Sequence, residues 1–133
     1  MAIEARLDVI GIVVADMGKA LAFYRRLGLP VPDGADDQPH VEVALPGGTR
    51  LLFDTEETIA SFHPQWRAPS GGGRLGFAFQ LPGTEAVDAA YAELTSAGYR
   101  GELAPFDAFW GQRYAIVLDP DGTGVDLFAP LAG

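Results

Sequence analysis

The feature that most constrains the fold is an internal repeat. In each half of the chain, a short apolar run is followed by an apolar stripe at positions i, i+3, i+4 and i+7, the spacing of one face of a helix. The stripe residues are Ala20, Phe23, Tyr24 and Leu27 in the first half and, each 67 residues later, Val87, Ala90, Tyr91 and Leu94. The repeat predicts two copies of one supersecondary unit.

The residues around each stripe indicate where strands and helices begin and end. Leu7 to Val14 and Leu75 to Leu81 are typical of strands, Asp16 is suited to cap the first helix, and Pro82-Gly83-Thr84 forms a turn and cap before the second. Gly28 and Gly98 are suited to end the two helices.

Three strands are expected after each helix. The first is short, near residues 29–31 in one half and 100–103 in the other, and the next two form a hairpin. Gly47-Gly48 and Asp121-Gly122 mark the two hairpin turns. The predicted fold class is therefore α+β, with two βαβββ modules.

The segment between the modules is rich in proline and glycine. We expect one domain over residues 1–133, made of modules at about 1–55 and 74–133 and joined by residues 55–73. Glu56 to Phe62 is a candidate helical turn, and Gly71 to Gly73 forms a flexible joint. This glycine run is not expected to bind phosphate, because no strand immediately precedes it and no lysine follows it.

Composition excludes several classes of function. Eighteen acidic residues against nine basic ones give a formal net charge of -9, which disfavours binding to nucleic acid or to an anionic membrane surface. The chain has no cysteine, so disulfides, thiolate nucleophiles and cysteine metal sites are excluded. The N-terminus lacks the apolar run of a signal peptide and no stretch is long enough to span a membrane, so a cytoplasmic location is expected.

Several motifs resemble those of the vicinal oxygen chelate superfamily, which includes glyoxalases, extradiol dioxygenases and bleomycin-resistance-type proteins. They are Ile10-Gly-Ile-Val-Val-Ala-Asp16, Ala20-Leu-Ala-Phe-Tyr-Arg-Arg-Leu-Gly28, Phe109-Trp-Gly-Gln112 and Asp119-Pro-Asp-Gly122. The resemblance implies that paired half-open mixed sheets form a cup with the helices outside, and that the protein is a homodimer.

Enzymes of this superfamily hold a divalent metal in the cup. Carried onto this chain, the four ligand positions fall on Val9, Leu52 (or Phe53 if the register shifts by one), Gly76 and Asp126. Only Asp126 offers a donor atom, and one carboxylate does not hold a divalent ion. His40 and His63 have no partner at ligand-like spacing on their own segments. We therefore expect no metal, no other cofactor and no catalytic residue.

Two carboxylates are candidates for other chemistry. Asp54 and Asp126 lie on corresponding strands of the two modules and are candidates to face one cavity. The alternative is that Asp54 lies in water at a strand end and Asp126 makes a hydrogen bond to a neighbouring loop. A buried Asp126 needs a partner. A bound cation, Arg50 or Arg113, or a raised pKa would each supply a solution.

Aromatic residues at the expected mouth of the cup are candidates for ligand contacts. Strand alternation directs Phe77 and Phe79 toward a helix. The aromatic residues left for the ligand are Trp66, Phe106, Phe109, Trp110 and Phe128. Such rings stack on planar or cationic molecules, although each tryptophan could equally fill a local core.

Three functions are compatible with this sequence. The first is non-enzymatic binding of a small planar, amphipathic or cationic molecule, similar to drug sequestration, at Asp126, Trp110, Phe109, Trp66, Leu52, Phe53, Val9, Gly76 and Phe128. The second is an enzyme of the same fold, with metal ligands at other positions or with Asp126 in metal-free acid–base chemistry. The third is a dimeric scaffold with a filled cup.

Overall fold

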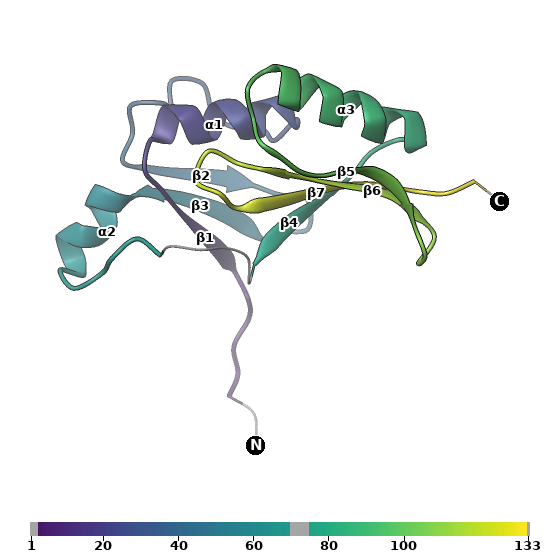
Figure 1. Cartoon of the computed structure of the whole chain (residues 1–133). Coiled ribbons are helices and arrows are strands. Elements are labelled where there is room, and N and C mark those ends of the chain that lie inside the picture. The colour runs from purple at the N-terminus through teal and green to yellow at the C-terminus, as the bar shows by residue number, and fades with distance from the viewer. Residues whose placement is uncertain (1–2, 70–74, 133) are drawn as a thin grey trace. The chain divides into compact units, whose positions relative to one another are not determined.

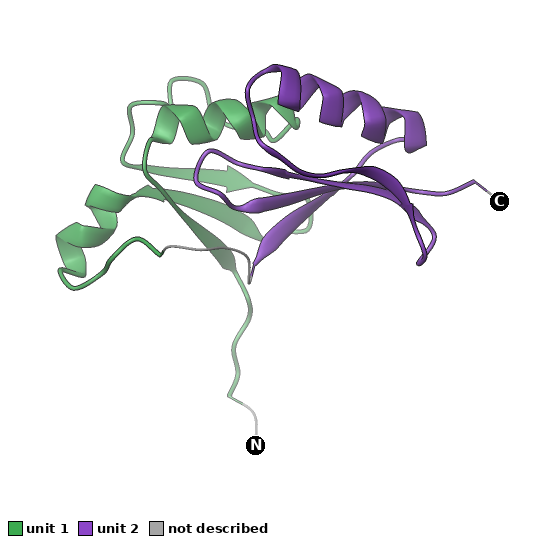
Figure 2. Ribbon diagram, in the orientation of Figure 1, with its two compact units in different colours: residues 1–69 green, residues 70–133 purple. Residues whose placement is uncertain are grey.

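The computed structural model describes residues 3–69 and 75–132 and divides the chain into two compact units. Unit 1 is Met1–Pro69 and unit 2 is Ser70–Gly133, as Figure 2 shows, and Figure 1 labels their helices and strands. In the described residues, unit 1 has a three-stranded sheet and unit 2 a four-stranded sheet, and three helices accompany them. This α+β architecture confirms the predicted pair of βαβββ-type modules.

Unit 1 is built around a mixed sheet in the order β1-β3-β2, with β1 parallel and β2 antiparallel to β3. Its elements are β1 (Val9–Val14), α1 (Met17–Arg26), β2 (His40–Ala44), β3 (Arg50–Thr55) and α2 (Glu56–Phe62). Alternate strand residues are buried beneath α1, where the rings of Tyr24 and Phe53 lie 5.4 Å apart. The other side of this sheet, away from α1, is called its distal face below.

Unit 2 has a mixed sheet in the order β4-β7-β6-β5, with β4 parallel to β7 and the other pairs antiparallel. Its elements are β4 (Gly76–Gln80), α3 (Thr84–Ser96), β5 (Gly101–Ala108), β6 (Gln112–Leu118) and β7 (Gly124–Pro130). The helix α3 packs on β5, β6 and β7. Val87 and Leu94 are the buried residues of α3, and the buried residues of β6 and β7 are Ala115, Val117, Val125, Leu127 and Ala129.

Both long helices end in the same way, which confirms the predicted glycine stops. Gly28 and Gly98 have φ angles of 84° and 101°, a left-handed conformation that favours glycine. The amides of Leu29 and Tyr99 then donate to the carbonyls of Tyr24 and Leu94, at 3.2 and 3.1 Å. At the start of α1, Asp16 accepts a hydrogen bond from the Lys19 amide at 2.9 Å, as predicted for a cap.

Several local expectations are corrected by the structure. Residues 29–31 do not form a strand, because Pro30 and Pro32 have no amide hydrogen to donate to a sheet. The cap of α3 is Gly83, without a side-chain hydrogen bond, and Thr84 is the first helical residue. The short strand expected at residues 100–103 is the beginning of β5.

Two features were predicted for the joining segment, a helical turn and a glycine joint. The candidate turn at Glu56–Phe62 is confirmed as α2. The predicted joint at Gly71–Gly73 lies outside the described residues. Among the residues that are described, no helix has both the length and the apolar character needed to cross a membrane.

Candidate functional site

In unit 2, the strand register brings Asp126 and several aromatic residues to the sheet face away from α3. This face is called the distal face of unit 2. In the register, Ile116 is opposite Asp126, Tyr114 is opposite Phe128, and Ala78 is beside Asp126 on β4. Because alternate residues point to opposite sides of a sheet, all of these lie on the face that Val125 and Leu127 do not occupy. Gly76 belongs to the same face, since it pairs with Gly124.

Four aromatic rings gather at the end of β5 and β6 and in the turn between them. We call Phe106, Phe109, Trp110 and Tyr114 the aromatic cluster. The Trp110 ring lies edge-to-face with the rings of Phe109 at 5.0 Å, Tyr114 at 5.2 Å and Phe106 at 6.3 Å. Edge-to-face pairs of this kind stabilise one another beyond their apolar contact. Phe109 is nonetheless 97% exposed and Trp110 48% exposed, so much of their surface remains available to a ligand.

Tyr114 joins the aromatic cluster to Asp126. Its hydroxyl donates a short hydrogen bond to Oδ2 of Asp126. Burial, then this hydrogen bond and the negative charge of Asp126, raise the pKa of Tyr114 to about 12. The phenol therefore stays neutral at physiological pH and supplies the partner that the sequence required for Asp126.

Neither arginine proposed as a partner for Asp126 contacts it. Arg113 binds Asp88 at 2.9 Å and Asp107 at 3.1 Å, and Arg50 binds Asp8 and Glu42. The hydrogen bond from Arg50 and its positive charge hold the pKa of the Asp8 carboxyl below its usual value. Asp126 thus has a hydrogen-bond donor, but no ion pair with any basic residue in the described ranges.

Unit 1 contributes different predicted residues, on its own distal face. Val9 and Leu52 lie on this face by strand alternation. Phe53 lies on the opposite side, fully buried against Tyr24, and this removes it from the candidates for ligand binding. Trp66 is partly buried after α2, where its amide donates to the His63 carbonyl at 3.0 Å.

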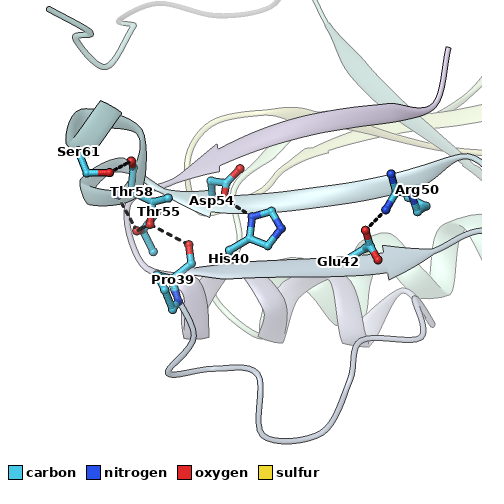
Figure 3. A network of polar contacts seen from close by, with 8 residues as sticks. All are labelled: Pro39, His40, Glu42, Arg50, Asp54, Thr55, Thr58 and Ser61. Carbon is cyan, nitrogen blue, oxygen red and sulfur yellow. Dashed lines mark hydrogen bonds and ion pairs between the residues drawn. The ribbon is translucent and has the colours of Figure 1, made fainter. Parts of the chain in front are cut away.

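A histidine–aspartate pair on the same face was missed by reasoning within single segments. His40 and Asp54 are opposite each other on β2 and β3, with Nδ1 2.5 Å from Oδ1 (Figure 3). Asp54 is therefore not a water-exposed strand end: its side chain is 19% exposed. The hairpin turn at Gly47-Gly48 could have predicted the pair, because it sets which residues of β2 and β3 are opposite.

An acidic depression of about 700 Å³ also lies in unit 1, near the starts of α1 and α2. Its acidic lining residues are Asp16, Asp36, Asp37 and Glu57. Two of them have structural roles, since Asp16 caps α1 and Asp36 pairs with Arg25 at 2.7 Å. We assign no ligand to this depression.

A family model described as Glyoxalase/Bleomycin resistance protein/Dioxygenase superfamily matches residues 6–127. The chain belongs to this superfamily. A search of curated proteins finds no match.

Solved structures of superfamily members share the fold. A glyoxalase/bleomycin resistance protein/dioxygenase family enzyme from Burkholderia phytofirmans has a TM-score of 0.79 at 20% identity, over 96% of this chain and 100% of that one. A glyoxalase/bleomycin resistance protein/dioxygenase from Nocardioides has a TM-score of 0.72 at 22% identity, over 100% and 88%. A glyoxalase-related enzyme from Fulvimarina pelagi scores 0.76 at 17% identity, over 93% and 87%. At these identities the likeness concerns the fold alone.

The metal of superfamily enzymes does not fit the side chains at the corresponding positions. Val9, Leu52 and Gly76 have no donor atom in their side chains, and the Asp126 carboxylate already accepts a hydrogen bond from Tyr114. Across residues 3–69 and 75–132, no three His, Cys, Asp or Glu side chains are grouped closely enough to hold a metal ion. Metal independence stays a prediction. So does a cavity shared by Asp54 and Asp126, because they belong to different units.

Proposed function

We propose that the protein binds a small planar or amphipathic cation on the distal face of unit 2, without changing it chemically. The observation that carries this proposal is a carboxylate, Asp126, next to a cluster of partly exposed aromatic rings. Carboxylates attract cations, and the faces of aromatic rings attract them further. Asp126 comes from β7, and the aromatic cluster comes from β5, β6 and the turn between them, so both kinds of group belong to one sheet and its hairpin.

The state of Tyr114 supports a cationic ligand rather than proton-transfer chemistry at Asp126. Because the pKa of Tyr114 is about 12, the phenol keeps its proton and donates a hydrogen bond to Asp126. The Asp126 carboxylate thus already accepts a hydrogen bond from the Tyr114 hydroxyl, and a ligand cation would supply the opposite charge. The net charge of -9 favours a cationic ligand over an anionic one.

Membership of the superfamily supports a role in sequestering such a molecule, as in bleomycin-resistance-type proteins. We expect a homodimer and a cytoplasmic location for the same protein, with no nucleic-acid or membrane partner. Beyond Asp126 and the aromatic cluster, we expect Phe128 and Gly76 of unit 2 to line the ligand.

Tryptophan fluorescence tests the proposal. The chain has two tryptophans, so the variant Trp66→Phe leaves Trp110 as the single reporter. We expect saturable quenching by N-methylquinolinium, a planar cation, and much weaker binding of neutral quinoline. Linear, unsaturable quenching by both compounds would contradict the proposal.

Calorimetric titration with Zn²⁺, Mn²⁺ and Fe²⁺ tests the metal-independent part. We expect no high-affinity site, because hard and borderline cations need several protein donors. A sub-micromolar site that disappears in Asp126→Asn would instead favour the metal-dependent chemistry of the superfamily's enzymes.

A further inference from the structure

His40 and Asp54 form a histidine–carboxylate pair that the proposed binding function does not use. Nδ1 of His40 is 2.5 Å from Oδ1 of Asp54, while the His40 side chain is 52% exposed. Figure 3 shows the second ring nitrogen directed away from Asp54. Within the described residues, this nitrogen, Nε2, makes no hydrogen bond. The carboxylate favours the tautomer with the proton on Nδ1 and a free lone pair on Nε2.

The backbone on both sides of the pair is fixed by a separate set of hydrogen bonds (Figure 3). The carbonyl of Pro39, which precedes His40, accepts from the Thr55 amide at 3.1 Å and from the Thr58 hydroxyl at 3.0 Å. Thr55, which follows Asp54, also caps α2 by accepting from the Thr58 amide at 3.2 Å. One junction thus holds β2, β3 and α2 together and pre-organises the pair, as a functional side chain requires.

The surroundings of the pair disfavour an anionic substrate. Asp54 is beside Val13 of β1 in the register, and Leu52 and Gly11 form the neighbouring row on the same face. A side chain at Gly11 would meet no atom within 4 Å, so the surface there is open. The nearby Arg50 is already bound to Asp8 and Glu42. Carboxylates therefore predominate, and they repel an anionic substrate.

We propose that His40 is a general base that removes a weakly acidic proton from carbon in a small molecule that carries no negative charge and rests on Val13 and Leu52. The Nε2 lone pair takes the proton, and the electrons of the broken C–H bond remain on the substrate as a carbanion. Asp54 stabilises the imidazolium formed. Return of the proton to another atom of the substrate completes an isomerisation, with no oxidant or co-reactant.

The probe 5-nitrobenzisoxazole isolates the base step. Removal of its ring C–H proton forms a nitrile and breaks the N–O bond, which releases a coloured phenolate. We expect the protein to accelerate this reaction and His40→Gln to lose about 10-fold or more of the acceleration. His63→Gln is the matched control and should retain it, because His63 lies outside the pair. Equal rates for His40→Gln and the unaltered protein would overturn the proposal.

Asp54 is a positioning residue in this proposal, and its test includes a spectroscopic readout. Asp54→Asn should lower the rate and remove the preference for the Nδ1–H tautomer in the ¹⁵N NMR spectrum of His40. An unchanged tautomer and rate would contradict its role. If a variant failed to fold, diethyl pyrocarbonate would test the unaltered protein. The proposal requires that the base activity is lost as His40 is modified. Activity that is lost only when His63 is modified would overturn the proposal.

These tests are independent of the cation-binding proposal. They change residues of unit 1 alone, whereas the proposed cation anchor and aromatic cluster belong to unit 2. Failure of the base activity therefore leaves the fluorescence test of Trp110 unaffected, and the reverse also holds.

Discussion

At the scale of single residues, the site depends on which side chains share one sheet face. Tyr114 and Asp126 lie on antiparallel strands, two positions from being directly opposite, a diagonal distance that a long aromatic side chain can span. Sequence reasoning identified Asp126 and the aromatic residues but assigned Asp126 a candidate arginine partner. It could not identify Tyr114, because the diagonal contact depends on the register and twist of two strands.

The raised pKa of Tyr114 predicts a loss of stability at alkaline pH. A phenol in the unfolded chain ionises near pH 10, whereas Tyr114 in the folded protein ionises at about 12. The stabilising contribution of the neutral phenol is therefore complete below pH 10 and is lost as the pH rises to 12.

Urea denaturation of the unaltered protein and Tyr114→Phe at several pH values checks this prediction. The difference in free energy of unfolding between the two should change across pH 10–12 in favour of the phenylalanine variant. A difference that stays constant over this range would contradict the assigned pKa.

The histidine–aspartate pair shows what register information adds. Neither residue has a partner within its own segment, so spacing along the chain does not reveal the pair. The hairpin turn centred on Gly47 places residues whose numbers sum to 94 opposite each other, as in Val43↔Leu51 and His40↔Asp54. This rule for the register of a hairpin, applied to the sequence, predicts the pair, although it does not predict the orientation of the two side chains.

At the scale of elements, the internal repeat was the most informative feature. The two apolar stripes predicted α1 and α3, and the glycines that follow predicted where they end. The prediction of a short strand at residues 29–31 was wrong, because proline removes the hydrogen-bond donors that a sheet needs. This local effect outweighs the expectation that the first module repeats the strands of the second.

Glycine substitutions test the assignment of the helix ends. Gly28→Ala should lower the free energy of unfolding by about 1 kcal/mol, because a side chain is strained at a φ of 84°. Gly11→Ala is the matched control, since its added Cβ meets no atom within 4 Å and its φ is not left-handed. Chemical denaturation should show a smaller loss for the control; equal losses would contradict the assignment.

At the scale of the whole molecule, the superfamily fold and the acidic charge have separate consequences. The fold supplies two sheets on which side chains are displayed, and members of one fold carry out different functions. The charge biases the protein toward cations. Function must therefore be tested at the residues themselves, because neither the fold nor the charge identifies the ligand.

Ionic strength should weaken the proposed binding. Added salt screens the attraction between the acidic protein and a cation, so the affinity for N-methylquinolinium should fall between low and high salt. Neutral quinoline should show no such decrease. An affinity for the cation that is independent of salt would contradict an electrostatic contribution.

The association state is a further prediction for the whole molecule. Light scattering coupled to size-exclusion chromatography should give about twice the chain mass of 14.1 kDa, because a homodimer is expected for this superfamily. A mass equal to that of one chain at all concentrations would contradict the expected dimer.

The most direct test of the central claim is the affinity of Asp126→Asn for N-methylquinolinium, measured by calorimetry. Glu102→Gln, on β5, is the control that changes the net charge by the same amount. We predict that Asp126→Asn binds about 10-fold more weakly, which corresponds to about 1.4 kcal/mol, and that Glu102→Gln binds as the unaltered protein does. Equal affinities for all three proteins would contradict the proposal that Asp126 anchors a cationic ligand.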